Sequence, residues 1–278
     1  VLETDEAFNT FENIEIDNLL VTNIDNDHLD YFESFTNLVE AFTRVINKVK
    51  QTVVINHDDD NLRKIQINNF ITYGEHKEVD IRISEPNIIS YQKKNHTVDS
   101  ALIGKHYLSN IAGAIALCTL YQLPISEILE AISKFSGVKR RLEYIGTYKE
   151  VKFYDDYGHH PTEIKATISA LKKNTLGKLF VIFQPHRFTR TRDNFEQLQE
   201  SLEDADFAVV TDVYSAGEEP IPGISSKNFK GKNIKYIKSL RSVPIYIKEN
   251  IKSGDNVLTL GAGDVTLLGP QILKYLND

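Results

Sequence analysis

VKFYDDYGHHPTEIKATISALKKNTLGKLFVIFQ, residues 151–184, predicts a strand, a helix and a second strand in direct succession. The apolar runs at 151–157 and 178–184 have the length and composition of strands, and Pro161 suits the first turn of the helix between them. Strand, helix and strand in this order form the unit from which parallel sheets are built. We therefore expect an α/β fold.

The same alternation continues on both sides of this segment. Residues 65–103 are richer in β-branched side chains and predict a small antiparallel excursion. After Gly137 a new alternation of expected strands and helices begins. We therefore expect two domains, 1–137 and 138–278, the second of them a doubly wound unit. The other expected elements are strands at 19–24, 52–56, 207–213 and 256–261, and helices at 35–49, 106–121, 124–137, 193–204 and after the last strand.

Composition narrows the class of protein. A chain of 278 residues with 41% hydrophobic and 26% charged residues is typical of a soluble globular protein with two domains. No apolar run is long enough to span a bilayer, and the acidic start is unlike a signal peptide. The single cysteine, Cys118, favours a reducing, cytoplasmic setting, and the net charge of -7 argues against non-specific nucleic-acid binding. Because the chain begins at Val1 and has Met 0, we expect it to be part of a longer reading frame.

Two acidic clusters lie in the first 30 residues. Ligands of open α/β sheets bind beyond the carboxyl ends of the strands, and NIDNDHLD (23–30) follows the expected strand at 19–24. Its carboxylates and His28 could hold a divalent ion, magnesium by preference for oxygen ligands, or could simply cap the helix that follows. Glu3, Asp5 and Glu6 form the second cluster, for which a solvated terminus is the simpler interpretation.

DDYGHHPTE (155–163) is a third cluster, at a strand-to-helix turn. Two histidines beside two aspartates at the end of a strand favour a functional site over packing. Glu163 suits the positive end of the helix that begins at Pro161. A zinc hydrolase stays open as an alternative, although the side chains of neighbouring histidines diverge.

QPHRFTRTR (184–192) is the fourth cluster. Arg187 and Arg190 could clamp an amino-acid carboxylate, because guanidinium groups bind carboxylates through paired hydrogen bonds. Cations at a helix N-terminus oppose its dipole, so we expect these charges to answer an anionic ligand. The alternative is a basic helix start exposed to water. GAGD (261–264) is a glycine turn that lacks the dinucleotide-binding pattern.

The order of seven segments resembles that of the Mur ligases, most of all their alanine-adding branch and the related ligase that recycles murein tripeptide. The resemblance implies a truncated central P-loop-type ATPase sheet followed by a Rossmann-like domain. The segments are ETDE (3–6), TNIDNDHLD (22–30), FSGVKRR (135–141), YDDYGHHPTEI (154–164), FQPHRFTRTRD (183–193), DVYSAGEEPI (212–221) and GAGD (261–264).

The resemblance also implies a reaction and roles for single residues. An ATP-dependent ligase would join L-alanine to UDP-N-acetylmuramate through an acyl phosphate, for peptidoglycan precursors, using ATP and Mg2+ and no nucleic-acid or membrane-inserted partner. His159 or His186 could accept the amine proton. The matching positions are Glu3 and His28 for metal, Asn110 and Arg141 for the nucleotide, Tyr157, His159, His186, Arg187 and Arg190 for substrates and catalysis, and Asp156 as their positioning partner.

Three features depart from the family pattern. No G-x-x-x-x-G-K-S/T phosphate loop occurs in the 278 residues, and the UDP-binding domain is absent from them. His106-Tyr107 stands where the family has His-Asn, which weakens the assignment of Asn110 to adenine. We expect this stretch alone to be inactive and the full-length protein to be active. The competing hypotheses are the murein tripeptide ligase, a metal-dependent hydrolase and a non-catalytic fragment that retains the fold.

Overall fold

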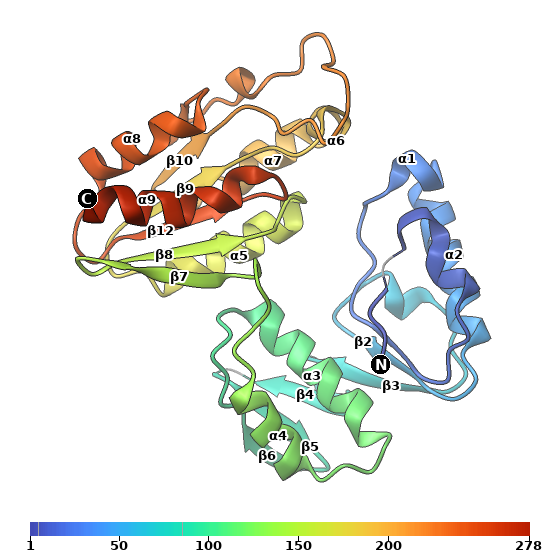
Figure 1. Ribbon diagram of the computed structural model, residues 1–278. Helices are drawn as coiled ribbons and strands as arrows, with labels where there is room; N and C mark the ends of the chain where they lie inside the picture. The colour runs from blue at the N-terminus through green and yellow to red at the C-terminus, as the bar shows by residue number, and fades with distance from the viewer. Residues whose placement is uncertain (5, 85) are drawn as a thin grey trace. The chain divides into compact units, whose positions relative to one another are not determined.

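A computed structural model describes residues 1–4, 6–84 and 86–278 (Figure 1). Asp5 of the predicted acidic terminus lies outside the described residues, as does the side chain of Asp30. The chain divides into an N-terminal unit, residues 1–101 and 105–136, and a C-terminal unit, residues 102–104 and 137–278. Each unit is built around its own six-stranded sheet.

The sheet of the N-terminal unit has the order β1-β2-β3-β4-β5-β6. Its first four strands are parallel, and only β5 and β6 are antiparallel to their neighbours. The antiparallel excursion expected over 65–103 is therefore wrong for its first half, because β3 and β4 extend the parallel sheet. The strands are β1 (Leu19–Val21), β2 (Val53–Asn56), β3 (Phe70–Gly74), β4 (Ile81–Ser84), β5 (Ile88–Tyr91) and β6 (Lys94–Thr97).

Helix α2 (Phe35–Lys48) shows why the helices of this unit form where they do. The Ser34 side chain caps it by accepting the Asn37 N–H at 3.2 Å. Its apolar stripe packs into a core with β1 and β2, as the three- and four-residue spacing predicts. The other helices are η1 (Ala7–Asn13), α1 (Leu29–Phe32), η2 (Leu62–Lys64), α3 (Lys105–Thr119) and α4 (Ile125–Lys134).

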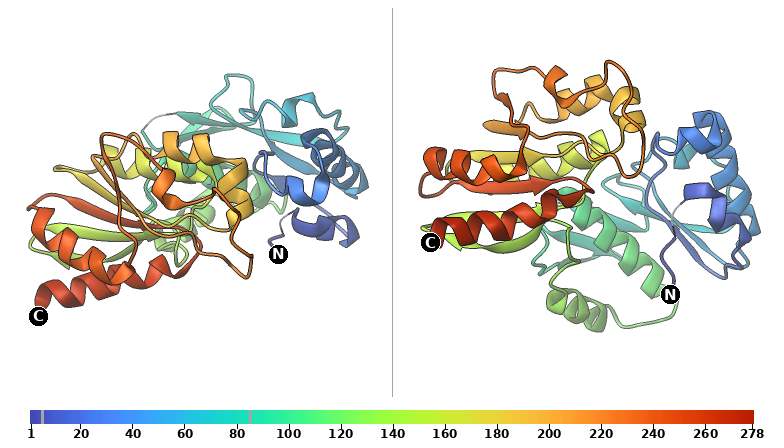
Figure 2. Two further views of the ribbon diagram at one scale, coloured as in Figure 1. Left: turned by 90° about the horizontal axis from the view of Figure 1, so that it is seen from above. Right: turned by 45° about the horizontal axis from the view of Figure 1, so that its top comes forward.

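The sheet of the C-terminal unit has the order β11-β10-β9-β12-β8-β7, and all neighbours are parallel except β7 and β8. Helices cover both faces (Figures 1 and 2): α5 and α7 lie on one side, and α8 and α9 on the other. This arrangement confirms the doubly wound α/β fold. The strands are β7 (Glu143–Tyr148), β8 (Val151–Asp156), β9 (Leu179–Phe183), β10 (Phe207–Val210), β11 (Ile234–Tyr236) and β12 (Asn256–Leu260).

The helices of the C-terminal unit differ from expectation at three places. The helix expected over 193–204 is shorter, α7, which begins after Asn194 (φ -120°, ψ 22°) and ends at Ser201. Helices α6 and α8 were not expected. No helix among the described residues has the length and apolar content needed to cross a membrane. The helices are α5 (Pro161–Lys173), α6 (Phe188–Asp193), α7 (Phe195–Ser201), α8 (Val243–Asn250), α9 (Leu268–Asn277), η3 (Ser226–Asn228), η4 (Leu240–Ser242) and η5 (Asp264–Leu267).

Candidate active site

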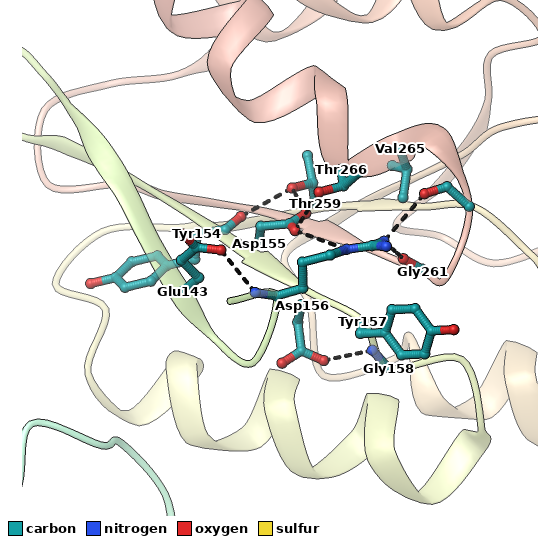
Figure 3. A network of polar contacts seen from close by, with 12 residues as sticks. Glu143, Tyr154, Asp155, Asp156, Tyr157, Gly158, Thr259, Gly261, Val265 and Thr266 are labelled. Carbon is teal, nitrogen blue, oxygen red and sulfur yellow. Dashed lines mark hydrogen bonds and ion pairs between the residues drawn. The ribbon is translucent and has the colours of Figure 1, made fainter. Parts of the chain in front are cut away.

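Asp155 is completely buried at the carboxyl end of β8, where both of its oxygens accept hydrogen bonds (Figure 3). Thr259 Oγ1 donates to Oδ1 at 2.6 Å, and Thr266 Oγ1 donates to Oδ2 at 2.7 Å. Arg140 Nε lies 3.5 Å from the same Oδ2. The enclosed Asp155 carboxylate links β8 to β12 and to the segment that follows β12. It therefore holds the strand ends of the site in place.

Arg140 connects the start of the C-terminal unit to the glycine turn. Its Nη2 donates to the carbonyl oxygens of Gly261 at 2.7 Å and Gly263 at 3.2 Å. Its guanidinium carbon lies 4.8 Å from the centre of the Tyr157 ring, and the Tyr157 N–H donates to the Arg140 carbonyl at 2.7 Å. Arg140 belongs to the FSGVKRR segment, but the sequence predicts no role for it, because its partners lie up to 123 residues away.

Asp156 is also buried, and its oxygens are engaged by the backbone. Oδ2 accepts the Leu142 N–H at 2.7 Å. Oδ1 accepts the Gly158 N–H at 2.8 Å (Figure 3). Burial raises the pKa of Asp156 to about 6, against the opposing effect of these two hydrogen bonds. The carboxylate thus shapes the turn that carries Tyr157 and His159.

Glu163 fastens this turn to the start of α5. Its Oε2 accepts the N–H groups of His159 at 3.1 Å and His160 at 3.2 Å, which confirms its expected role at the helix N-terminus. Arg141 Nη1 lies 3.2 Å from its Oε1, so Arg141 is anchored within the C-terminal unit. Burial opposes ionisation of Glu163, but the His159 charge and these hydrogen bonds lower its pKa.

Tyr157, His159 and His186 are brought together from two loops that follow β8 and β9. The His159 ring lies edge-on to Tyr157 at 5.3 Å and 5.9 Å from the His186 ring, measured between centres. His159 Nδ1 faces the Tyr157 carbonyl oxygen at 3.2 Å and Glu163 Oε2 at 3.7 Å. Three of the predicted substrate-binding side chains therefore share one small region.

His186 is stacked on Tyr214, with ring centres 5.5 Å apart and planes 13° from parallel. Burial, then the neighbouring charges of His159, Arg190 and Arg187, lower the pKa of His186 to about 4. The two arginines thus act on His186, whose ring lies 5.9 Å from that of His159. The fourth cluster and the third therefore face the same region, as expected for strand-end loops of one sheet.

Arg187 meets a carboxylate that sequence reasoning did not assign. Glu218 Oε1 accepts its Nε–H at 2.6 Å, and the same carboxylate accepts the Thr189 N–H at 3.0 Å and the Thr189 hydroxyl at 2.6 Å. One anion that answers Arg187 is therefore the chain's own, and the binding of a ligand carboxylate stays a prediction. Glu218 belongs to the quoted DVYSAGEEPI motif, which was the only available signal.

The Gln184 side chain is hydrogen-bonded to the glycine turn at 261–264 and to the residue after it. Its Nε2 donates to Asp264 Oδ1 at 2.7 Å, and its Oε1 accepts the Val265 N–H at 3.1 Å. Gly261 has φ 143°, and a Cβ there would lie 2.6 Å from the Gln184 carbonyl oxygen. The glycine turn is thus a close approach of two backbone segments.

The loop after β1 carries the predicted metal ligand His28. It is the residue before α1, with a left-handed φ of 54°, and its Nε2 lies 3.8 Å from Asp27 Oδ2. Glu3, the other predicted ligand, is exposed. Across residues 1–4, 6–84 and 86–278, no three His, Cys, Asp or Glu side chains converge as a metal site, so a zinc-hydrolase centre has no ligand cluster there.

Asn110 lies on an exposed position of α3 in the N-terminal unit. One turn earlier, the His106 and Tyr107 rings pack together with centres 4.3 Å apart. Tyrosine at 107 therefore gives this helix start an aromatic surface where the family pattern has an amide. The adenine-binding role of Asn110 stays a prediction.

Two family models match the chain. Residues 4–118 match the Mur ligase middle domain, and residues 140–263 match the Mur ligase, glutamate ligase domain. Among curated relatives, UDP-N-acetylmuramate--L-alanine ligase of Endomicrobium trichonymphae is 40% identical over 99% of this chain and 65% of its own length. The protein of the same name from Dictyoglomus turgidum is 35% identical over 98% of this chain and 64% of its own length.

Solved structures agree on the fold. UDP-N-acetylmuramate-alanine ligase from Thermotoga maritima superposes with a TM-score of 0.75 at 23% identity, covering 96% of this chain and 61% of that one. The MurF ligase from Thermotoga maritima, in complex with ADP, gives 0.76 at 21% identity, covering 95% and 62%. The chain thus spans slightly less than two thirds of its relatives. It carries the middle and C-terminal domains of the Mur ligases and belongs to that family.

Proposed function

We propose that the full-length protein is an ATP-dependent ligase that joins L-alanine to UDP-N-acetylmuramate in peptidoglycan precursor synthesis. The observation that carries the proposal is the grouping of Tyr157, His159 and His186 beside the charges of Arg187 and Arg190. The names of the relatives at 40% and 35% identity support the choice of substrates. A cytoplasmic location belongs to the same proposal, since ATP is its energy source.

The guanidinium groups would bind the carboxylate of alanine and orient its amine. Holding two reactants in position removes much of the entropic barrier to their reaction. Arg190 lies in α6, and Arg187 is the residue immediately before that helix, so both charges are presented from the start of one helix. Positive charge placed before reaction also stabilises the negative charge that gathers during acyl transfer.

His159 is the better candidate to accept the amine proton. A general base works best when its pKa lies near the operating pH, and a pKa of about 4 makes His186 a weak acceptor at neutrality. His159 has Nδ1 directed at the Tyr157 carbonyl oxygen, which leaves Nε2 as the nitrogen that would act. His186 would remain neutral and contribute hydrogen bonding and shape.

ATP and Mg2+ are part of the proposal. Mg2+ keeps several waters and is bound by one or two protein side chains together with substrate phosphates, so a complete protein cage is not required. The exposed Glu3 and the half-buried His28 fit such a sparse site in chemistry. When bound, the ion would neutralise phosphate charge. Asn110 and Arg141 would contact the nucleotide.

Phosphate release by the full-length protein tests the proposal, with UDP-N-acetylmuramate and either L-alanine or murein tripeptide. Release with alanine supports it, and release only with tripeptide or with neither overturns it. Arg190→Lys should raise the KM for alanine roughly tenfold or more with little change for ATP, because an ammonium cannot form the two-pronged contact. Arg192→Lys is the matched control, since Arg192 pairs at the surface with Asp193 at 2.6 Å.

A further inference from the structure

The segment after β10 folds back over the loop that carries the candidate substrate-binding arginines. Ala216 and Gly217 have φ of 50° and 88°, and the Glu218 N–H donates to the Ser215 carbonyl at 3.0 Å. This tight turn brings the Glu218 side chain to the start of α6. The turn at 214–218 thus lies against the Arg187 side chain.

The Glu218 carboxylate is engaged in more than a helix cap. Capping α6 needs only the bond from the Thr189 N–H at 3.0 Å. The further contact with Arg187 Nε, at 2.6 Å, fixes the guanidinium plane. The Glu218 side chain is 17% exposed. Burial opposes its ionisation, but hydrogen bonds from Thr189 and Arg187 lower its pKa to about 2, so the group is charged at neutral pH.

The geometry of a guanidinium decides what this contact can do. A carboxylate that binds Nε uses a different edge of the group from the one formed by the two terminal nitrogens. Two-pronged recognition of a ligand carboxylate commonly uses two parallel N–H donors of the same guanidinium. Holding Arg187 by Nε therefore sets the direction in which the terminal nitrogens point.

Backbone hydrogen bonds hold the start of the turn at 214–218 beside His186. The Arg187 N–H donates to the Tyr214 carbonyl at 2.8 Å, and the Tyr214 N–H donates to the Pro185 carbonyl at 2.8 Å. The Tyr214 ring covers the His186 ring. Both ends of the turn at 214–218 thus hold a side chain of the candidate substrate site.

We propose that Glu218 is a positioning residue, which orients the Arg187 guanidinium for the carboxylate of the acceptor amino acid. The inference rests on the proposed function for the identity of the acceptor. The orientation of Arg187 by Glu218 is a physical claim that can be measured without turnover.

Kinetics of the full-length protein test the first part. Glu218→Gln should raise the KM for the acceptor roughly tenfold, with the KM for ATP changed less than about twofold, because a misdirected arginine loses orientation of one substrate only. Glu219→Gln is the matched control at the exposed neighbouring position. In an Arg187→Lys background the Glu218→Gln effect should shrink to less than about twofold, since the cycle isolates the pair. Equal effects on acceptor and ATP, or equal behaviour of the two glutamine variants, would overturn the proposal.

Nitrogen-15 NMR of the Arg187 Nε–H group separates this inference from the function. The resonance, assigned by its loss in Arg187→Lys, should exchange slowly with water in the wild type and in Glu219→Gln, and at least about tenfold faster in Glu218→Gln, because a hydrogen-bonded donor must open before exchange. Equal exchange in all three proteins refutes the positioning role, even if the ligase is active. Slow exchange that depends on Glu218, in a protein without ligase activity, refutes the proposed function and leaves the orientation of Arg187 established.

Discussion

The chain carries carboxylates and a histidine at the carboxyl ends of both β1 and β8, yet it uses them in opposite ways. In the loop after β1, Asp25 and Asp27 each accept the N–H of the next residue at 2.8 Å. At the end of β8, Asp155 and Asp156 accept hydrogen bonds from residues 14 to 111 positions away, and Asp156 also accepts the nearby Gly158 N–H. The Asp27 side chain is 27% exposed and that of Asp155 is fully buried.

The difference shows which part of each loop is available to a ligand. Where carboxylates accept hydrogen bonds from N–H groups of their own loop and are partly exposed, they can turn towards a metal ion at little cost. Where they are buried and bonded to distant residues, they hold the backbone, and we propose that the neighbouring imidazole and guanidinium groups contact the ligands. Similar sequences at two strand ends therefore predict different chemistry once burial is known.

Removing the Asp155 charge should produce the largest effect. Asp155→Asn removes the negative charge that faces Arg140, and the new amide also donates where a carboxylate oxygen accepted from Thr259 or Thr266. We expect the free energy of unfolding to fall by about 4 kcal/mol, as when a buried ion pair is broken. Urea denaturation measures it. Asp193→Asn breaks a surface pair and should cost less than about 1 kcal/mol; equal costs would show that Asp155 is no structural centre.

A side chain at Gly261 should have the next largest effect. The new Cβ of Gly261→Ala would lie 2.6 Å from a backbone oxygen, at a φ that L-residues rarely adopt. We therefore expect the free energy of unfolding to fall by about 3 kcal/mol. Gly217→Ala is the control, because its φ of 88° is also unfavourable but nothing lies within 4 Å of the new atom. Gly217→Ala should lower the free energy of unfolding by about 1 kcal/mol. Thermal melting compares the two, and a larger loss for Gly217 would contradict the close approach.

Asp156 should make stability depend on pH in a defined window. Its pKa is about 6 in the folded chain against 3.8 in the unfolded chain, so the folded state binds more protons between these values. The free energy of unfolding should therefore fall by about 2 kcal/mol as pH rises from 4 to 6, and Asp156→Asn should remove this slope.

Glu218 provides the opposite sign as a control. Its folded pKa of about 2 lies below the unfolded value of 4.5, so its contribution is present above pH 4.5 and is lost as pH falls towards 2. Glu218→Gln should remove the slope of that acid limb and leave the slope between pH 4.5 and 6 unchanged. If Asp156→Asn leaves the profile between pH 4 and 6 untouched, the carboxyl is not buried as described.

The smallest expected effect concerns the loop after β1. In the full-length protein, His28→Ala should raise the magnesium concentration for half-maximal phosphate release roughly threefold to tenfold, at most about 1.4 kcal/mol. Asn26→Ala, at the exposed loop position two residues earlier, should leave the titration unchanged. Identical titrations for wild type and His28→Ala would assign the loop a structural role, and the contrast with the loop after β8 would lose its functional meaning.

Much of the fold follows from sequence because its causes are local. The apolar stripe of α2, Pro161 at the start of α5 and Glu163 as its acidic cap are all visible in short windows. Strands β7 and β11 are not: β11 has only three residues, and β7 is an edge strand interrupted at Gly146 by a register shift. Edge strands lack the continuous apolar runs that mark buried parallel strands.

The site is predictable to a similar depth. Tyr157 and His159 follow β8, and His186 follows β9. Only β12 separates these two parallel strands in the sheet, so the meeting of the three side chains follows from topology. The hydrogen-bond partners of Arg140 and Arg187 cannot be predicted from topology in this way. A hydrogen bond between residues 31 or 121 positions apart depends on the detailed packing of two loops.

Gln184 fills the volume that a side chain at position 263 would need, since a Cβ there would overlap its Oε1 atom and lie 2.7 Å from the Tyr214 ring. Positions 184, 214 and 263 are consequently constrained as a set. In a lineage that replaced Gln184 by a smaller residue, glycine at 263 would lose part of its necessity, whereas a change at 263 alone would be eliminated. Substitutions at these three positions should therefore be inherited in a fixed order, glutamine first and glycine last.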